Sequence, residues 1–195
     1  GTSVAQGELI LLCDDDDLLT KDHLQTMINE IKGHDLLFSD VEIVQYELEG
    51  NQRIPTGRRL FAYDWNIELM RQFSTFVPSG CLYRKAIHET IGEFDSEIHN
   101  YWDWDFFLRV AMEFKVKKVS QASVLYSFSS DGDNQSALLN GVRQAYLKKL
   151  CEKHRLGNLP TANFFTLLEQ PEMKEREAES KIVWDGNGIR SRLVD

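Results

Sequence analysis

The sequence predicts an α/β domain in which helices cover both faces of a mixed β-sheet. An apolar run at residues 8–13 has the length of a buried strand and is followed by four consecutive aspartates. Short apolar segments then alternate with stretches that carry helix-capping and helix-stopping residues. The 195 residues are 42% hydrophobic and 11% aromatic. This composition and length fit one globular domain, or one domain with an appendage.

The first part of the chain predicts strands and helices in alternation. Residues 8–13 are expected to form the first strand, because they are apolar and short. Thr20 is a plausible N-cap for a helix over residues 21–32, which Gly33 would end. Residues 35–46 predict the next strand.

The middle of the chain is expected to be less regular. A turn is predicted at residues 49–51, followed by an irregular loop at residues 51–62 that contains Pro55 and Gly57. After it we expect a helix capped by Asp64 and ending near Gln72, a strand at residues 81–83 and a helix at residues 85–91.

The second half predicts further helices and strands, and then a change of character. The expected elements are a loop at residues 95–101, a helix at 104–114, strands at 116–119 and 123–128, and a helix from Ser136 to about His154. The composition shifts beyond this helix, at Pro160 and a charged patch over residues 174–177. We therefore expect a domain over residues 1–155 and a helical tail over residues 156–195.

Charge and cysteine usage exclude several classes of protein. The chain has 31 acidic and 22 basic residues and a net charge of −9, which argues against general nucleic-acid binding. No segment is long and apolar enough to predict a transmembrane helix, and no secretory signal is evident. The three cysteines, Cys13, Cys81 and Cys151, form no CxxC pair. We therefore expect a reducing, cytoplasmic environment without disulfides or zinc.

The four aspartates at residues 14–17 predict a site for a divalent cation and a diphosphate. Four carboxylates at the end of a buried strand repel one another, and a hard cation that binds phosphate oxygens would offset this cost. Side chains two apart in an extended segment point the same way, so Asp14 and Asp16 can face one site. The alternative is an acidic turn at a helix start, but one Asp would suffice for a cap. The spacing excludes an EF-hand.

A second acidic group lies at residues 101–105, where Asp103 and Asp105 alternate with Tyr101, Trp102 and Trp104. A carboxylate at a helix start beside aromatic rings can act as a general base with a shifted pKa. The alternative is that Asp103 only caps the helix while Trp104 packs in the core. Residues 92–95 favour a structural turn.

Four segments in order give a more specific resemblance. They are residues 7–17, 79–85, 91–95 and 102–109. In this order and spacing they resemble a family 2 glycosyltransferase of the GT-A fold, over roughly residues 5–150. The resemblance implies a three-layer α/β/α sandwich with a mixed sheet.

That resemblance also implies an activity and roles for individual residues. The reaction would be an inverting transfer of a sugar from a nucleotide-diphosphate sugar donor to a hydroxyl of a glycan or lipid-linked acceptor, with Mg²⁺ or Mn²⁺, in polysaccharide or cell-envelope synthesis. The DxD element maps onto Asp14, Asp15 and Asp16. Asp16 would bind the metal, and Asp14 would lie near the nucleotide ribose and the metal. Asp103 maps onto the base that deprotonates the acceptor.

The sequence departs from the family pattern in three ways. The opening strand and nucleotide-base region are absent, so we expect a C-terminal portion of a catalytic domain, inactive alone and self-associating through its exposed sheet face. Trp102 stands where an acidic residue is common. No His follows the last core strand, so the third metal ligand is unknown, with Asp131 and Asp133 as candidates.

Two other functions remain open from the sequence. A haloacid-dehalogenase-like phosphatase also places a DxD behind an apolar strand, but Asp17 and Leu18 stand where that family has Gly and Thr. A degenerate transferase domain that binds a glycan or a protein partner without catalysis is the second.

Overall fold

A computed structural model of the chain describes residues 1–128, 141–161, 166 and 168–190. In this part the central feature is an eight-stranded mixed sheet. Five of its strands follow the order β1-β5-β3-β4-β8. β6 pairs with β3 as well, and β2 and β7 both pair with β6. Parallel and antiparallel pairing meet at β3, which is parallel to β6 and antiparallel to β4 and β5. The strands are β1 (Leu9–Leu11), β2 (Leu18–Leu19), β3 (Leu36–Glu49), β4 (Gln52–Phe61), β5 (Cys81–Arg84), β6 (Val116–Phe128), β7 (Lys181–Ile182) and β8 (Ile189–Arg190).

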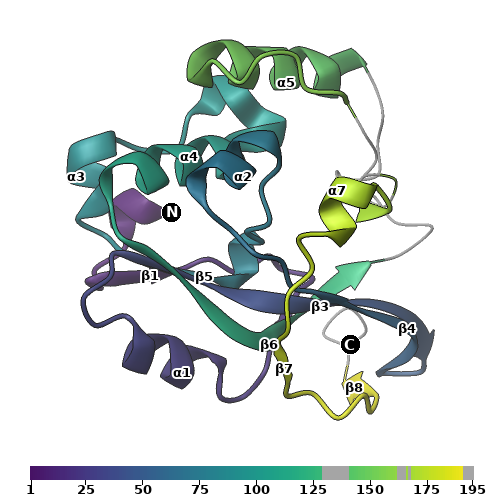
Figure 1. The fold of residues 1–195 in the computed structure, drawn as a ribbon. Helices are drawn as coiled ribbons and strands as arrows, with labels where there is room; N and C mark the ends of the chain where they lie inside the picture. The colour runs from purple at the N-terminus through teal and green to yellow at the C-terminus, as the bar shows by residue number, and fades with distance from the viewer. Residues whose placement is uncertain (129–140, 162–165, 167, 191–195) are drawn as a thin grey trace.

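Helices lie on both faces of this sheet, which confirms the three-layer prediction (Figure 1). One face carries α1 (His23–Glu30), and the other carries α4 (Trp102–Glu113) with α2, α3 and α5 around it. The bounds of the remaining helices are α2 (Ile67–Gln72), α3 (Ile87–Ile91), α5 (Gly141–His154) and α7 (Pro171–Lys174), with short 3-10 turns η1 (Thr2–Val4), η2 (Pro78–Gly80) and η3 (Ser96–Tyr101).

The core divides into layers that match this architecture. The largest cluster lies between the sheet and α4, where Phe106 and Phe107 pack with Leu36 and Phe38. Met27 of α1 belongs to a smaller cluster on the opposite face. Burial of these large side chains is the main stabilising contribution, roughly 1.5–3 kcal/mol for each of them.

The predicted loop at residues 51–62 is wrong, because this segment forms strand β4. Gly50, with φ of 58°, reverses the chain, and β4 then pairs antiparallel with β3 along its whole length. A register shift between Gln45 and Tyr46 accommodates Pro55, which lies opposite Tyr46. Pro is tolerated because β8 pairs only with the first two residues of β4.

Other element boundaries differ from the prediction in smaller ways. The helix start predicted at Thr20 lies at His23, because the Thr20 N–H pairs with the Ser123 carbonyl of β6 instead. Asn66, rather than Asp64, caps α2 by accepting a hydrogen bond from the Leu69 N–H at 2.9 Å. The two strands expected at 116–119 and 123–128 are one continuous strand, the loop at 95–101 contains η3, and the helix expected at 104–114 begins at Trp102. Ser136 lies outside the described residues.

The segment after residue 155 contributes more than a helical tail. Its helix α7 is short, and the segment also contains two strands, β7 and β8, that the sequence did not predict. β7 adds to β6 and β8 adds to β4, so this segment completes two edges of the sheet.

Candidate active site

The four aspartates form a turn between β1 and β2, and residues 14–17 are called the aspartate turn below. The Asp17 N–H donates to the Asp14 carbonyl at 3.3 Å, which closes the turn. Asp14 and Asp15 are exposed, Asp16 is half-buried and Asp17 is buried. The four neighbours in the sequence therefore occupy different environments.

Asp17 holds the turn in place. Its carboxylate accepts hydrogen bonds from the Ser79 hydroxyl of η2 and from the Ser127 N–H of β6, the latter at 3.0 Å. Burial raises the pKa of Asp17 to about 7, against the lowering effect of these two hydrogen bonds. Its side chain is only 5% exposed, so Asp17 serves the fold, and the other three carboxylates remain for a ligand.

The main chain of the turn is held from both sides. The Asp14 N–H donates to the Ser79 hydroxyl at 3.0 Å. The Asp16 carbonyl accepts from the Ser127 hydroxyl and, at 2.8 Å, from Nη1 of Arg53. These bonds use main-chain atoms of Asp14 and Asp16. Within the described residues, the carboxylates of Asp14 and Asp16 form no hydrogen bond.

Negative charge is crowded around Asp14. Desolvation and then repulsion by Asp16 and Asp15 raise the pKa of the Asp14 carboxyl above its ordinary value. A bound cation would reverse this repulsion, which is the electrostatic signature expected of a cation site.

Asp103 lies in the first turn of α4 and shares this site. The pKa of Asp103 is raised to about 6, mainly by burial and to a smaller extent by the negative charge of Asp14, while hydrogen bonds to the main chain of Trp104 and Asp103 and the positive charge of Arg143 act to lower it. The charge of Asp14 acts on Asp103, so the two carboxylates lie near each other although 89 positions separate them in the sequence. Arg143 is itself held by Tyr101, whose hydroxyl accepts a hydrogen bond from Nε of Arg143 at 3.0 Å.

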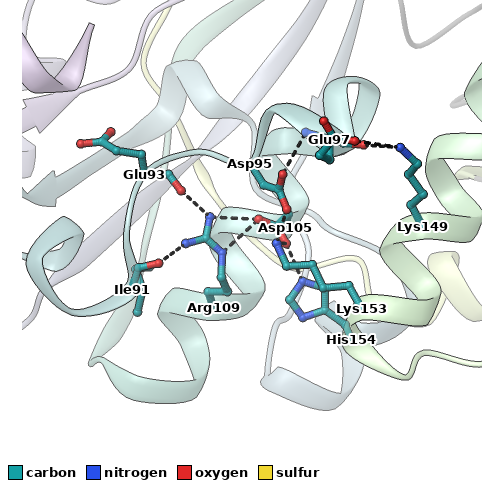
Figure 2. Close-up of polar contacts among 9 residues, drawn as sticks. All are labelled: Ile91, Glu93, Asp95, Glu97, Asp105, Arg109, Lys149, Lys153 and His154. Atoms are coloured by element: carbon teal, nitrogen blue, oxygen red, sulfur yellow. Dashed lines mark hydrogen bonds and ion pairs between the residues drawn. The ribbon is translucent and has the colours of Figure 1, made fainter.

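Asp105, which lies close to Asp103 in the sequence, has a structural role (Figure 2). Its fully buried carboxylate contacts Nη2 of Arg109 at 2.9 Å, Nζ of Lys153 at 2.7 Å and Nε2 of His154 at 2.7 Å. Burial alone would raise the pKa of Asp105, but the hydrogen bonds from His154 and Lys153 and the charge of Arg109 lower it to about 2. Asp105 therefore ties α5 to α4.

The turn at residues 92–95 belongs to the same assembly, in agreement with its structural interpretation. Arg109 donates to the carbonyls of Ile91 at 2.6 Å and Glu93 at 3.0 Å (Figure 2). Asp95 accepts from the Glu97 N–H at 2.9 Å and pairs with Lys153 at 2.6 Å.

The sequence did not identify Ser79, Ser127 and Arg53, which hold the aspartate turn. Two other arginines of β4 form ion pairs with glutamates instead: Arg58 pairs with Glu42 at 2.6 Å, and Arg59 pairs with Glu169 at 2.8 Å. No local pattern marks the three supporting residues, since each meets the turn from a distant segment.

The residues present fit a divalent cation that is shared with a ligand. Within the described ranges, no group of three or more His, Cys, Asp or Glu side chains is arranged to hold a metal by itself. Mg²⁺ commonly takes only one or two carboxylates and completes its shell with water and substrate phosphates. Asp14 and Asp16 supply hard oxygen donors of this kind. Asp131 and Asp133 lie outside the described residues.

Comparisons with known proteins agree with the fold and the motif order. The model of the family described as "Glycosyltransferase like family 2" matches residues 1–156. The protein described as "Uncharacterized glycosyltransferase YwdF" of Bacillus subtilis is 54% identical over 193 residues, which are 99% of this chain and 72% of that protein.

A solved structure shares the fold at low sequence identity. The crystal structure of S. aureus TarS 1–349 in complex with UDP-GlcNAc matches with a TM-score of 0.55 and 17% identity. The match covers 89% of this chain, and the chain spans only 55% of the TarS chain. With a family match over most of its length and a relative above half identity, the chain belongs to the glycosyltransferase family 2-like proteins.

Proposed function

We propose that this chain carries the donor-metal and base residues for an inverting transfer of a sugar from a nucleotide-diphosphate sugar to an acceptor hydroxyl. The proposal is supported by the position of Asp103, which lies near enough to the aspartate turn for the charge of Asp14 to raise its pKa. This proximity would bring a candidate cation-binding turn and a candidate base to one site. The UDP-GlcNAc in the TarS complex supports this donor class, and family membership argues against the phosphatase alternative.

The residues divide the work as follows. Asp16 and Asp14 would hold Mg²⁺ or Mn²⁺, with Asp15 beside the nucleotide. When bound, the metal would neutralise the charge that grows on the departing diphosphate. Asp103, with its pKa raised to about 6, would be mostly ionised at neutral pH and would accept the proton of the acceptor hydroxyl.

The acceptor and the cellular setting are proposed on family grounds alone. A glycan or lipid-linked acceptor in cell-envelope or polysaccharide synthesis, and a cytoplasmic location, fit the proposed chemistry. In the described part of the chain, no helix combines the length and apolar character needed to cross a bilayer. Self-association through the sheet face remains a prediction, which light scattering can test.

The test separates donor binding from base catalysis in the full-length protein. Asp103→Asn should lower transfer by about 10²–10⁴-fold, the usual contribution of a general base, while calorimetry with UDP and Mn²⁺ shows unchanged binding. Asp16→Asn should weaken Mn²⁺ binding and transfer together. In the wild type, kcat/KM should fall as the pH drops below about 6, because Asp103 becomes protonated.

Unchanged transfer by Asp103→Asn would contradict the catalytic proposal and would favour a non-catalytic binding module.

A further inference from the structure

Arg53 is a buried cation directly behind the aspartate turn. Its side chain belongs to β4, and the residue is only 5% exposed. Nη1 donates to the Asp16 carbonyl and to the Ser127 hydroxyl, each at 2.8 Å, and Cζ lies 4.8 Å from the centre of the Tyr46 ring. Among the described residues, its Nε has no hydrogen-bond partner, and neither bonded acceptor of Nη1 is a carboxylate oxygen.

A buried guanidinium without a paired carboxylate is costly, because neutral acceptors repay only part of the lost hydration. Negative charge close by reduces that cost. Arg53 contacts the main chain of the very segment that carries Asp14, Asp15 and Asp16. Arg53 therefore holds the turn through a main-chain carbonyl and leaves the carboxylate oxygens of the turn available to a ligand.

The surroundings of Arg53 keep it in this position. Ser127 binds both Arg53 and the Asp16 carbonyl, which forms a closed set of three hydrogen bonds. On the other edge of β4, Arg53 pairs with Ile189 of β8. Trp184 and Ile189 also line a small cavity with Arg53, so the C-terminal segment covers the guanidinium.

We propose that Arg53 is a positioning residue for the metal-diphosphate site: it fixes the Asp16 main chain, so that the carboxylates of the aspartate turn are placed to bind a divalent cation. This inference rests on the proposed function, since it concerns the cation assigned to Asp14 and Asp16. Arg53 acts through Asp16 and does not touch the donor, because it is covered by Tyr46 and β8.

Mn²⁺ binding by the full-length protein tests the proposal without a transfer assay. Arg53→Gln removes the charge, whereas Arg53→Lys keeps the charge on a shorter side chain. Arg59→Gln is the matched control, since Arg59 lies on the same strand and pairs with exposed Glu169. Dissociation constants for MnCl₂ alone would be measured by electron paramagnetic resonance, and circular dichroism would confirm that each variant is folded.

We expect Arg53→Gln to weaken Mn²⁺ binding by about 10–100-fold, the range found when partners of metal ligands are removed. Arg53→Lys should give an intermediate loss, and Arg59→Gln should bind as the wild type does. Wild-type affinity in folded Arg53→Gln and Arg53→Lys would overturn the inference while leaving the proposed function intact. If Arg53→Gln does not fold, wild-type affinity in Arg53→Lys alone overturns it. A wild-type protein that binds no Mn²⁺, with or without UDP, would overturn both.

Discussion

Asp17 and Asp105 are both buried aspartates, yet their surroundings shift the pKa values of their carboxyl groups in opposite directions. Asp17 accepts hydrogen bonds from a hydroxyl and a main-chain N–H, and burial raises its pKa to about 7. Asp105 contacts Arg109, Lys153 and His154, which overcome the effect of burial and lower its pKa to about 2. The charge of a buried acid is therefore set by the charge of its partners more than by the depth of burial.

In both acidic groups, residues 14–17 and residues 103–105, one buried acid has a structural role and its acidic neighbours do not. Asp17 anchors the turn that presents Asp14, Asp15 and Asp16, and Asp105 anchors the helix that presents Asp103. In both places a buried acid anchors its segment, and its neighbours are the acids proposed to act on the substrate.

The largest effect is expected from Asp105→Asn. The change would leave Arg109 and Lys153 facing a neutral amide in a buried site, which typically costs about 3–5 kcal/mol. Urea denaturation measures this loss. Asp95→Asn is the control, because Asp95 also pairs with Lys153 but its side chain is 29% exposed. A loss no larger than that of the control would show that α5 does not depend on Asp105.

The two buried acids should make the stability of the fold depend on pH in opposite ways. The pKa of Asp17 is raised from 3.8 to about 7 in the folded state. Its stabilising contribution is therefore complete below about pH 4 and is lost as the pH rises through 7. For Asp105, with a pKa lowered to about 2, the contribution is present above about pH 4 and is lost as the pH falls through 2.

Asp17→Asn should remove the loss of stability that Asp17 causes as the pH rises through 7. The difference in unfolding free energy between the wild type and Asp17→Asn should change by at most roughly 4 kcal/mol between pH 4 and 7. Denaturation in the presence of EDTA would exclude a contribution from metal binding. A difference that is constant across this range would mean that Asp17 is ionised throughout, as Asp105 is.

The smallest effect is expected at an exposed acid. Glu169 pairs with Arg59 at 2.8 Å and Lys174 at 2.9 Å, but its side chain is 57% exposed. Water and salt screen such pairs, so Glu169→Gln should leave the unfolding temperature nearly unchanged. A marked drop would show that the position of α7 depends on this pair.

Much of the arrangement could be predicted because its signals are local or follow a known order of motifs. The apolar run before Asp14 predicts β1, and the aromatic residues around Asp103 predict a helix start. The order of four segments predicts the fold and the family, and the comparisons confirm both. The metal and base roles of Asp16 and Asp103 remain predictions.

What the sequence could not provide depends on contacts between distant segments. Ser79 and Ser127 reach Asp17 across 62 and 110 positions, so nothing near Asp17 distinguishes it from its three neighbours. Arg53 lay in a predicted loop because Pro55 and Gly57 usually interrupt strands. This segment forms a strand because it pairs with β3, and the residues of β4 alone do not reveal that pairing.

The two-residue offset between Asp103 and Asp105 has a consequence for how this protein can change. Successive residues of an α-helix are separated by about 100°, so these two acids project from nearly opposite sides of α4. Adding or removing one residue between them would rotate one acid away from its partners, whichever amino acid was involved. The two acids therefore constrain the length of this stretch, in addition to the constraint that the burial of Trp104 places on the residue between them.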